Sequence, residues 1–319
     1  MRVGVFTALL ANLSLDQVIE KLKGLGIYTV ELGTGNYPGG PHCSLSMLES
    51  KAAIKEFKQK LDDNGITVSA LSCHGEPLHP NPAIAKANQE VARKTVLLAE
   101  NLGVPVVVEF SGCPGESDKA KYPNWVTAAW PPHFPQILAW QWEKKVAPYW
   151  VKRGKFAADH GVKIGIEMHP GFVVYNPETM LKLRSIAGPS VGCNFDPSHL
   201  FWQGIDPIAA VRILGDAIVH VHAKDAQIYS VNLPMAGVLD TKSYTEERAR
   251  SWMFRTCGYG HDAGWWREFI STLRMYGYDY VLSVEHEDSL MSAEEGLTKA
   301  VRFLNEIVIK DKPGVAFWA

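Results

Sequence analysis

Residues 164–171 read IGIEMHPG, an apolar run that ends in a glutamate, a histidine and a proline–glycine turn. A short apolar run bounded by such a turn is typical of a buried β-strand. A carboxylate at the end of that strand is costly to bury unless a partner compensates its charge. A metal ion, a substrate or an ordinary ion pair can each be the partner, and the other strand ends help to distinguish them.

The same unit, a short apolar run followed by an amphipathic helical stretch, recurs along the chain. The other runs are RVGVFTAL (2–9), YTVELGT (28–34), ITVSALSCHG (66–75), PVVVEFSG (105–112), VGCNFDPSH (191–199), IVHVHAKD (218–225) and YVLSVEHED (280–288). Ser14 precedes the first helical stretch, and Gly26, Gly65, Gly103 and Gly161 close the first four. Eight such units, without a glycine-rich phosphate fingerprint after the first, predict a single α/β domain over residues 1–319, a (β/α)8 TIM barrel rather than an open doubly wound sheet.

The composition is that of an ordinary globular protein. The chain has 319 residues, a net charge of −2 and 46% hydrophobic residues. The charge balance disfavours a general nucleic-acid binder, and we expect neither a signal peptide nor a membrane span. Five scattered cysteines are expected to be free thiols, as in a cytoplasmic protein.

Two predicted connections are long. One runs from about Cys113 to Pro135 after the fourth strand, and the other from about Ala226 to Gly260 after the seventh. Both follow strands, so both are expected at the C-terminal mouth of the barrel. Loops of this length are usually lids or binding loops, although packing in a homo-oligomer is the alternative. Trp125 and Trp130 in the first loop, and Trp202, can either stack on the ring of a ligand or simply pack.

Alternate residues of a barrel strand point inward, and chemistry gathers at the C-terminal strand ends. On strands five to eight this rule places Val219, Val221, Ile164, Ile166, Met168, Leu282 and Val284 outward, and Gly165, Glu167, His169, Asn194, Asp196, His220, His222, Lys224, Ser283, Glu285 and Glu287 inward. Each of these four strands therefore delivers one strong metal ligand near the mouth: Glu167, Asp196, His222 and Glu285. Three converging carboxylates would repel one another unless a divalent cation joined them. Three oxygen ligands and one imidazole suit Mn²⁺, Mg²⁺ or Co²⁺, and Zn²⁺ remains open; Mn²⁺ is preferred.

The chain resembles the xylose isomerase-like barrel superfamily of sugar phosphate isomerases and epimerases. The resemblance covers nearly the whole chain and rests on IEMHPG, NFDPSHL, HVHAKD and VEHED in that order. Relatives include ketose 3-epimerases, inosose isomerase and dehydratase, and endonuclease IV. It implies that Glu167, Asp196, His222 and Glu285 bind one divalent metal, that the two glutamates act as an acid/base pair, and that His199 contacts substrate.

Two positions depart from the ketose epimerase pattern. Those enzymes carry an arginine shortly after the seventh-strand histidine, where this chain has only Lys224 as a substrate-binding candidate. A Glu-x-His such as Glu167 to His169 resembles lyase-type members, in which the histidine can act as a base; hydrogen bonding to Glu167 or to substrate is the alternative. Glu31, His74 and Glu109, at the ends of the second, third and fourth strands, are further candidates for substrate contacts.

These observations predict a metal-dependent sugar or cyclitol isomerase or epimerase that abstracts a proton next to a carbonyl through an enediolate. The alternative is a metal-dependent lyase or dehydratase acting on a keto sugar or a 3-keto-glycoside. A non-catalytic sugar-binding barrel is disfavoured because the four-residue set is intact. An endonuclease IV-like phosphodiesterase is disfavoured because Glu109 stands where that family has a histidine. The substrate, its phosphorylation and the oligomeric state are beyond the sequence.

Overall fold

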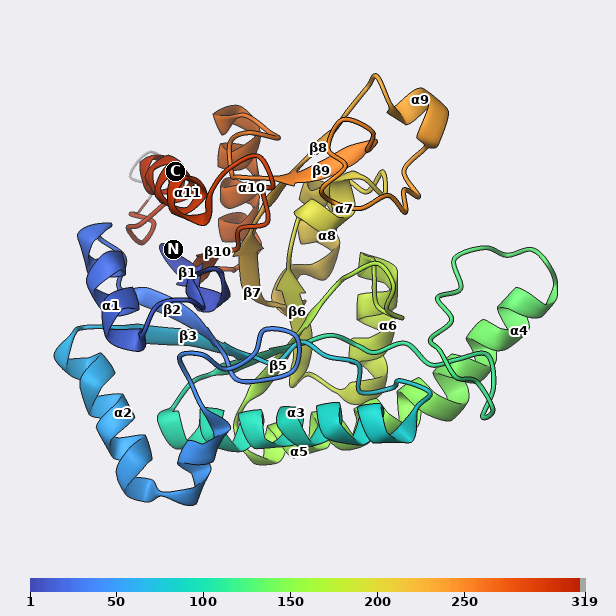
Figure 1. Cartoon of the computed structure of the whole chain (residues 1–319), viewed down its shortest axis with the longest axis horizontal. Helices are drawn as coiled ribbons and strands as arrows, with labels where there is room; N and C mark the ends of the chain where they lie inside the picture. The colour runs from blue at the N-terminus through green and yellow to red at the C-terminus, as the bar shows by residue number, and fades with distance from the viewer. Residues whose placement is uncertain (316–319) are drawn as a thin grey trace.

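The computed structural model describes residues 1–315, and within them eight parallel strands close into a barrel (Figure 1). The strand order around the barrel is β1-β10-β7-β6-β5-β4-β3-β2. The barrel strands are β1 (Arg2–Phe6), β2 (Thr29–Gly33), β3 (Thr67–Ser72), β4 (Val106–Glu109), β5 (Lys163–Glu167), β6 (Val191–Phe195), β7 (Ile218–Ala223) and β10 (Val281–Val284). The predicted (β/α)8 barrel and its eight strand segments are therefore confirmed.

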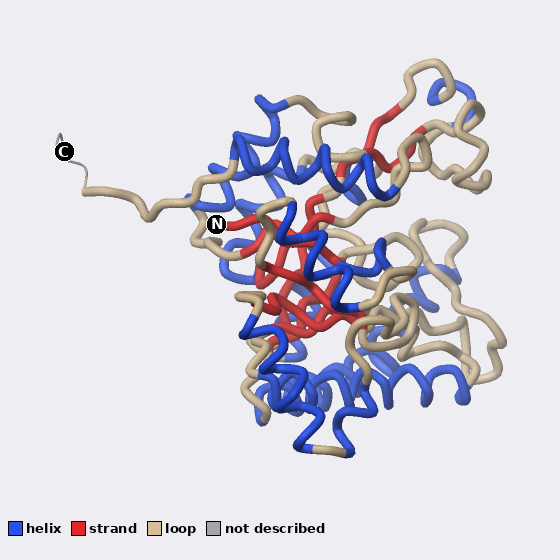
Figure 2. The backbone as a smooth tube through the Cα atoms, turned by 60° about the vertical axis from the view of Figure 1, so that its left-hand side comes forward, coloured by secondary structure: helices blue, strands red, loops and turns tan. Residues whose placement is uncertain are grey.

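Helices surround the barrel, as Figure 2 shows. They are α1 (Leu15–Gly24), α2 (Lys51–Asp63), α3 (Pro82–Leu102), α4 (His133–Trp140), α5 (Ala147–Asp159), α6 (Pro177–Ala187), α7 (Ser198–Phe201), α8 (Pro207–Leu214), α9 (Leu233–Ala236), α10 (Ala263–Met275) and α11 (Ala293–Ile307), with a π-helix, Gln141–Val146, between α4 and α5. The main hydrophobic core gathers outward strand residues such as Ile164 and Leu282 with helix residues such as Leu22 and Leu304. Burial of this apolar surface is the main force that holds the helices against the barrel. No helix within residues 1–315 is long and apolar enough to cross a bilayer.

The predicted helix signals act through identifiable backbone contacts. Ser14 accepts a hydrogen bond from the Gln17 N–H, and the Gln17 side chain accepts one from the Ser14 N–H, which completes a capping box at α1. Gly103 ends α3 in a left-handed conformation with φ of 74°. A side chain is strained at such a φ, so glycine is the natural residue there.

One predicted inward–outward assignment is wrong. Val219, expected to face the helices, instead packs with Ala70, Val106 and Val108 in a small cluster separate from the main core. The pairing of β6 with β7 shifts register between Cys193 and Asn194, which disturbs the simple alternation at this point. This apolar cluster fills the barrel interior and leaves the polar side chains to gather nearer the mouth.

Both long connections were predicted, and they emerge on the same side of the barrel in the two views (Figures 1 and 2). The connection after β4 reaches α4 at His133. The connection after β7 contains an antiparallel hairpin that the sequence did not reveal, made of β8 (Asp225–Ile228) and β9 (Trp252–Arg255). The hairpin is anchored by Asp225, whose carboxylate accepts hydrogen bonds from the backbone of Gly260 and His261 and from the Trp266 indole.

Candidate metal centre

Four ligand-type side chains converge at the C-terminal ends of four neighbouring strands. Glu167 ends β5, Asp196 follows β6, His222 lies on β7 and Glu285 follows β10. One donor atom from each lies within 4.8 Å of the other three. The His222 Nδ1 atom is 3.1 Å from an oxygen of Glu167 and 3.1 Å from an oxygen of Glu285. The structure therefore brings together the four residues that the sequence singled out.

Two buried atoms in this cluster make no hydrogen bond of good geometry within residues 1–315. They are Asp196 Oδ2, which lies 3.1 Å from Lys224 Nζ, and His222 Nδ1, which faces the two glutamates. The other oxygen of Asp196 accepts the Ser198 N–H at 2.8 Å in a turn that opens α7, so the side chain is held in place. An unpartnered buried polar atom costs free energy, and buried oxygen and nitrogen atoms that point into one space are the donor set of a divalent cation. The residues present thus fit a metal ion.

Two other groups of potential ligands overlap this cluster, Glu31–His220–His222 and Glu167–His169–His199. In the first, His220 is engaged on both ring nitrogens, with Asn194 Oδ1 at 2.8 Å and the Ser69 hydroxyl at 3.3 Å. Burial lowers the pKa of His220 to about 4. His220 therefore lies a layer deeper and is a hydrogen-bonded core residue, which supports His222 as the ligand from β7.

Three side chains hold the Glu167 carboxylate. His74 and Asn194 lie 2.9 Å and 3.1 Å from its Oε2 atom, and His199 lies 3.1 Å from Oε1. Burial alone would raise the pKa of Glu167, but the charge of His74 and the hydrogen bonds from these imidazoles lower it well below its usual value. Glu167 is thus an ionised and oriented carboxylate, and the predicted site residues His74 and His199 are among its direct contacts.

Glu31 lies behind His222 and is fully buried, so it does not reach the open part of the site where a substrate hydroxyl was expected. Its oxygens are 2.9 Å and 3.1 Å from His222 Nε2, and the Ser72 and Ser283 hydroxyls donate to it. Burial would raise the pKa of Glu31, but the charge of His222 and the hydrogen bonds from His222 and Ser283 lower it to about 2. A carboxylate behind a ligand histidine fixes its ring orientation and raises its basicity.

Lys224 is a buried cation beside the cluster. Its Nζ atom lies 2.8 Å from Glu285, 2.9 Å from Glu287 and 3.1 Å from Asp196 Oδ2. The ring of Phe254, from the unpredicted β9 strand, covers this ammonium at 4.7 Å. Phe254 also packs edge-on against His199. The hairpin after β7 therefore closes one side of the site, and nothing in the local pattern of the sequence singled out Phe254.

His169 lies at the mouth with its ring 4.1 Å from that of His199 and 4.8 Å from that of Phe110. Its Nδ1 atom is 2.6 Å from the Pro170 carbonyl oxygen. A carbonyl only accepts, so Nδ1 carries the proton and Nε2 is left as a free base. Burial lowers the pKa of His169 to about 3, which keeps the ring neutral.

Glu109 does not reach the site, contrary to the expectation that it contacts substrate. Val106 and Val108 of the same strand face the barrel interior, so Glu109 points outward to α5. There it forms a buried ion pair with Arg153, which also donates to the Ala92 carbonyl. The side chain belongs to the layer between barrel and helices.

Replacing Glu109 with Gln is expected to lower the free energy of unfolding by about 3–5 kcal/mol, because it leaves the Arg153 charge buried without its counter-charge. Urea denaturation of the wild type and the variant measures the difference. Glu143, which is exposed on the π-helix, provides the control: the corresponding Gln variant should unfold like the wild type. Equal midpoints for the Glu109 variant and the wild type would refute the structural role.

Glu76, in the loop after β3, is buried with an oxygen 2.5 Å from the Cys113 N–H. Burial raises the pKa of Glu76 to about 7 from an ordinary value of 4.5. Between these two pH values the folded chain binds the proton and the unfolded chain releases it. Stability therefore falls as pH rises through this window, by about 3 kcal/mol in total.

Replacing Glu76 with Gln should remove this contribution to the pH dependence. The unfolding free energies of wild type and variant, measured in urea at pH 5 and pH 8, isolate it, because all other groups titrate alike in both proteins. We expect the variant to gain stability relative to the wild type at pH 8. Parallel pH profiles for the two proteins would contradict the assignment.

The chain belongs to the xylose isomerase-like TIM barrel family, whose sequence model matches residues 19–307. It is 41% identical over 312 residues to the uncharacterized protein YfiH of Bacillus subtilis (strain 168), which covers 97% of this chain and 99% of that protein.

Three solved structures share the fold. The probable 3-DHS dehydratase AsbF from Bacillus anthracis has a TM-score of 0.67 at 18% identity, over 96% of this chain and 99% of that one. The zinc-bound IOLI protein has a TM-score of 0.65 at 17% identity, over 97% and 98%. A D-tagatose 3-epimerase-like protein has a TM-score of 0.64 at 22% identity, over 96% and 98%. At these identities the likeness shows the fold alone.

Proposed function

We propose that this protein is a divalent-metal-dependent isomerase or epimerase of a sugar or cyclitol. The observation that carries the proposal is the cluster of three carboxylates and one imidazole, in which Glu167 and Glu285 each lie 3.1 Å from His222 Nδ1 and Asp196 completes the set. A divalent cation held by Glu167, Asp196, His222 and Glu285 would supply Lewis acidity that polarises a substrate carbonyl. Mn²⁺ is the preferred ion among Mn²⁺, Mg²⁺, Co²⁺ and Zn²⁺.

Glu167 and Glu285 have different surroundings, which suits the two members of an acid/base pair. Glu167 is held ionised by His74 and His199, which makes it the candidate base that removes a proton next to the carbonyl. Glu285 is hydrogen-bonded to Lys224 and is more accessible, with 17% of its side chain exposed. It is ionised beside Lys224, so as the candidate partner it must first take up a proton from water or from a substrate hydroxyl and then return that proton to carbon. Lys224 offers a fixed positive charge to developing oxyanions.

A second candidate, a lyase or dehydratase acting on a keto sugar or 3-keto-glycoside, is supported by His169. Its free Nε2 base lies at the mouth, beside His199, and could remove or return a proton at a second carbon. Isomerisation, epimerisation and elimination share the first proton abstraction. They differ in where the proton returns and in whether a group leaves.

The test incubates the protein with Mn²⁺ and a panel of keto sugars and cyclitol ketones in D₂O, followed by NMR and mass spectrometry. Deuterium uptake with the carbon skeleton and all hydroxyls retained supports the isomerase. Loss of water or release of an aglycone supports the lyase. The absence of deuterium uptake and of elimination across the panel, together with sugar binding that is independent of metal, would favour the non-catalytic barrel.

A further inference from the structure

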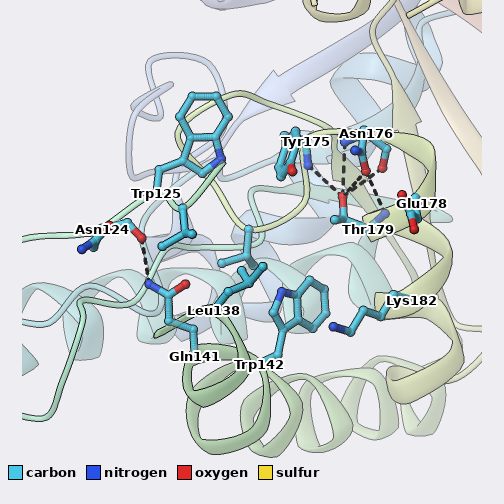
Figure 3. A pocket seen from close by; sticks show the side chains of 12 residues that line it. Asn124, Trp125, Leu138, Gln141, Trp142, Tyr175, Asn176, Glu178, Thr179 and Lys182 are labelled. Carbon is cyan, nitrogen blue, oxygen red and sulfur yellow. Dashed lines mark hydrogen bonds between the residues drawn. The ribbon is translucent and has the colours of Figure 1, made fainter. Parts of the chain in front are cut away.

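A second pocket, with a volume of about 230 Å³, lies outside the metal centre between the loop after β4, the π-helix and the loop that leads into α6 (Figure 3). Its wall includes Trp125, Gln141, Trp142, Tyr175 and Lys182. Pockets for drug-sized ligands have about 300–1,000 Å³, so this space suits a single small ring. We propose that it binds a neutral polyhydroxylated ring, a sugar or cyclitol unit, separately from the metal centre.

The first observation is the fully buried Gln141. Its Nε2 atom donates to the carbonyls of Pro114, Gly115 and Asn124 at 2.9, 3.2 and 2.7 Å, which ties down the long loop after β4. Carbonyls only accept, so the orientation of the amide is fixed. Its Oε1 atom is left buried on the pocket wall without a partner within residues 1–315. A buried acceptor of this kind is normally satisfied by a donor, either from a bound molecule or from an ordered water.

The second observation is the Trp125 indole, from the same loop. Its Nε1 atom is buried and has no hydrogen-bond partner in the described part of the chain. The indole stands edge-on to the Tyr175 ring at 5.4 Å. The pocket thus offers a donor from Trp125 and an acceptor from Gln141, and the hydroxyl groups of a polyol can satisfy such atoms because each one both donates and accepts.

Charge and shape at the rim favour a neutral ring over an ion. The Lys182 ammonium lies 4.2 Å from the centre of the Trp142 ring, and Glu178 on the same helix supplies the opposite charge. The two charges offset each other, so neither an anion nor a cation is favoured. The Trp125 and Tyr175 rings add apolar surface to the wall, which suits the C–H groups of a saturated ring. The six-residue π-helix that begins with Gln141 and Trp142 is a rare element, often found at functional sites.

The pocket is distinct from the metal centre but is tied to it. Gln203 Nε2 donates to the carbonyls of both Tyr175, at 3.2 Å, and His199, at 2.5 Å. Tyr175 is a wall residue of the pocket, and His199 contacts Glu167 in the metal centre. The binding proposal does not rest on the proposed function, because none of the pocket residues belongs to the metal-ligand set.

The test uses the full chain with ¹⁵N-labelled tryptophan, and follows the indole N–H signals while myo-inositol is added. The signal lost in a Trp125→Phe variant identifies Trp125. We expect this signal to shift saturably, and the signal of Trp130, which is 74% exposed in the same loop, to stay in place. Trp130→Phe assigns that control.

Lys182 lines the pocket, and in the proposed complex its ammonium donates a hydrogen bond to a hydroxyl of the bound ring. Lys182→Met removes that bond and should weaken the titration of the Trp125 signal about tenfold. Lys155→Met, which changes an exposed lysine on α5, should leave it unchanged. The titration should persist in Glu167→Gln, which separates it from the metal centre. A Trp125 signal that does not move, as for a pocket filled by water alone, would overturn the proposal, as would a titration lost in Glu167→Gln or unaffected by Lys182→Met.

Discussion

Glu167→Gln is expected to reduce deuterium uptake into the substrate at least a hundredfold. The carboxylate is the proposed base, and a positioned general base contributes about 10²–10⁴-fold to rate. Gln preserves the size and can still accept a hydrogen bond from either His74 or His199, which contact different oxygens of Glu167, but it cannot take a proton. The measurement is the initial rate of exchange in D₂O with whichever sugar the panel identifies.

Glu285→Gln is expected to have an effect of similar size, because the partner carboxylate returns the proton. Glu143→Gln, on the exposed face of the π-helix, is the matched control and should exchange at the wild-type rate. Retention of a near-normal rate by either active-site variant would contradict the paired-carboxylate scheme. Circular dichroism and thermal unfolding establish that each variant is folded.

The second large effect is expected from Glu31→Gln, although Glu31 is outside the proposed ligand set. Its carboxylate holds the Nε2 side of His222, so that Nδ1 faces the ligand cluster. Loss of such an outer-shell partner typically reduces metal affinity about 10–100-fold. Calorimetric titration with Mn²⁺ measures the change, with Glu143→Gln again as the control.

A purely structural role for Glu31 would lower thermal stability without changing Mn²⁺ affinity in the folded variant. That outcome would contradict its assignment as a positioning residue. Weaker Mn²⁺ binding at an unchanged stoichiometry is the expected result, because the four proposed ligands are all still present.

The barrel was predictable because its signals are local and repeated. Each strand–helix unit carries its own apolar run and often its own cap, such as the Ser14 capping box and the left-handed Gly103. The convergence of Glu167, Asp196, His222 and Glu285 was predictable because parallel strands place their C-terminal ends at one mouth. Each of four strands carries a ligand-type residue at an inward position near its C-terminal end, and this coincidence made the prediction of a metal site specific.

The wrong predictions concern strands whose local sequence pattern does not show whether a side chain points into the barrel or toward the helices. Strand β4 reads VVVE, so no alternation indicates which way Glu109 points, and only packing against Arg153 decides it. Val219 lies beside a register shift between β6 and β7 that the sequence pattern does not predict. The role of Glu31 depends on its contact with His222 across the barrel interior, between strands β2 and β7, which are not neighbours in the sheet.

The β8–β9 hairpin and the second pocket, at Trp125 and Gln141, were not predicted for a related reason. Phe254 and Gln141 acquire their roles from contacts between segments far apart in the chain. Phe254 covers Lys224, and Gln141 bonds three carbonyls of the loop after β4. Long connections have no period that would place their side chains in advance.

The central claim, that Glu167, Asp196, His222 and Glu285 form one divalent-metal site, is tested most directly by metal stoichiometry. The measurement is equilibrium dialysis of wild type and Asp196→Asn against Mn²⁺, followed by elemental analysis. Asp196 is suited to this test because its Oδ2 atom is buried in the cluster and makes no hydrogen bond of good geometry in the described chain, although Lys224 lies 3.1 Å away. The account predicts about one Mn²⁺ per wild-type chain and a large loss of affinity in the folded variant. A wild-type chain that binds no divalent ion, or a variant that binds Mn²⁺ as tightly as the wild type, would contradict it.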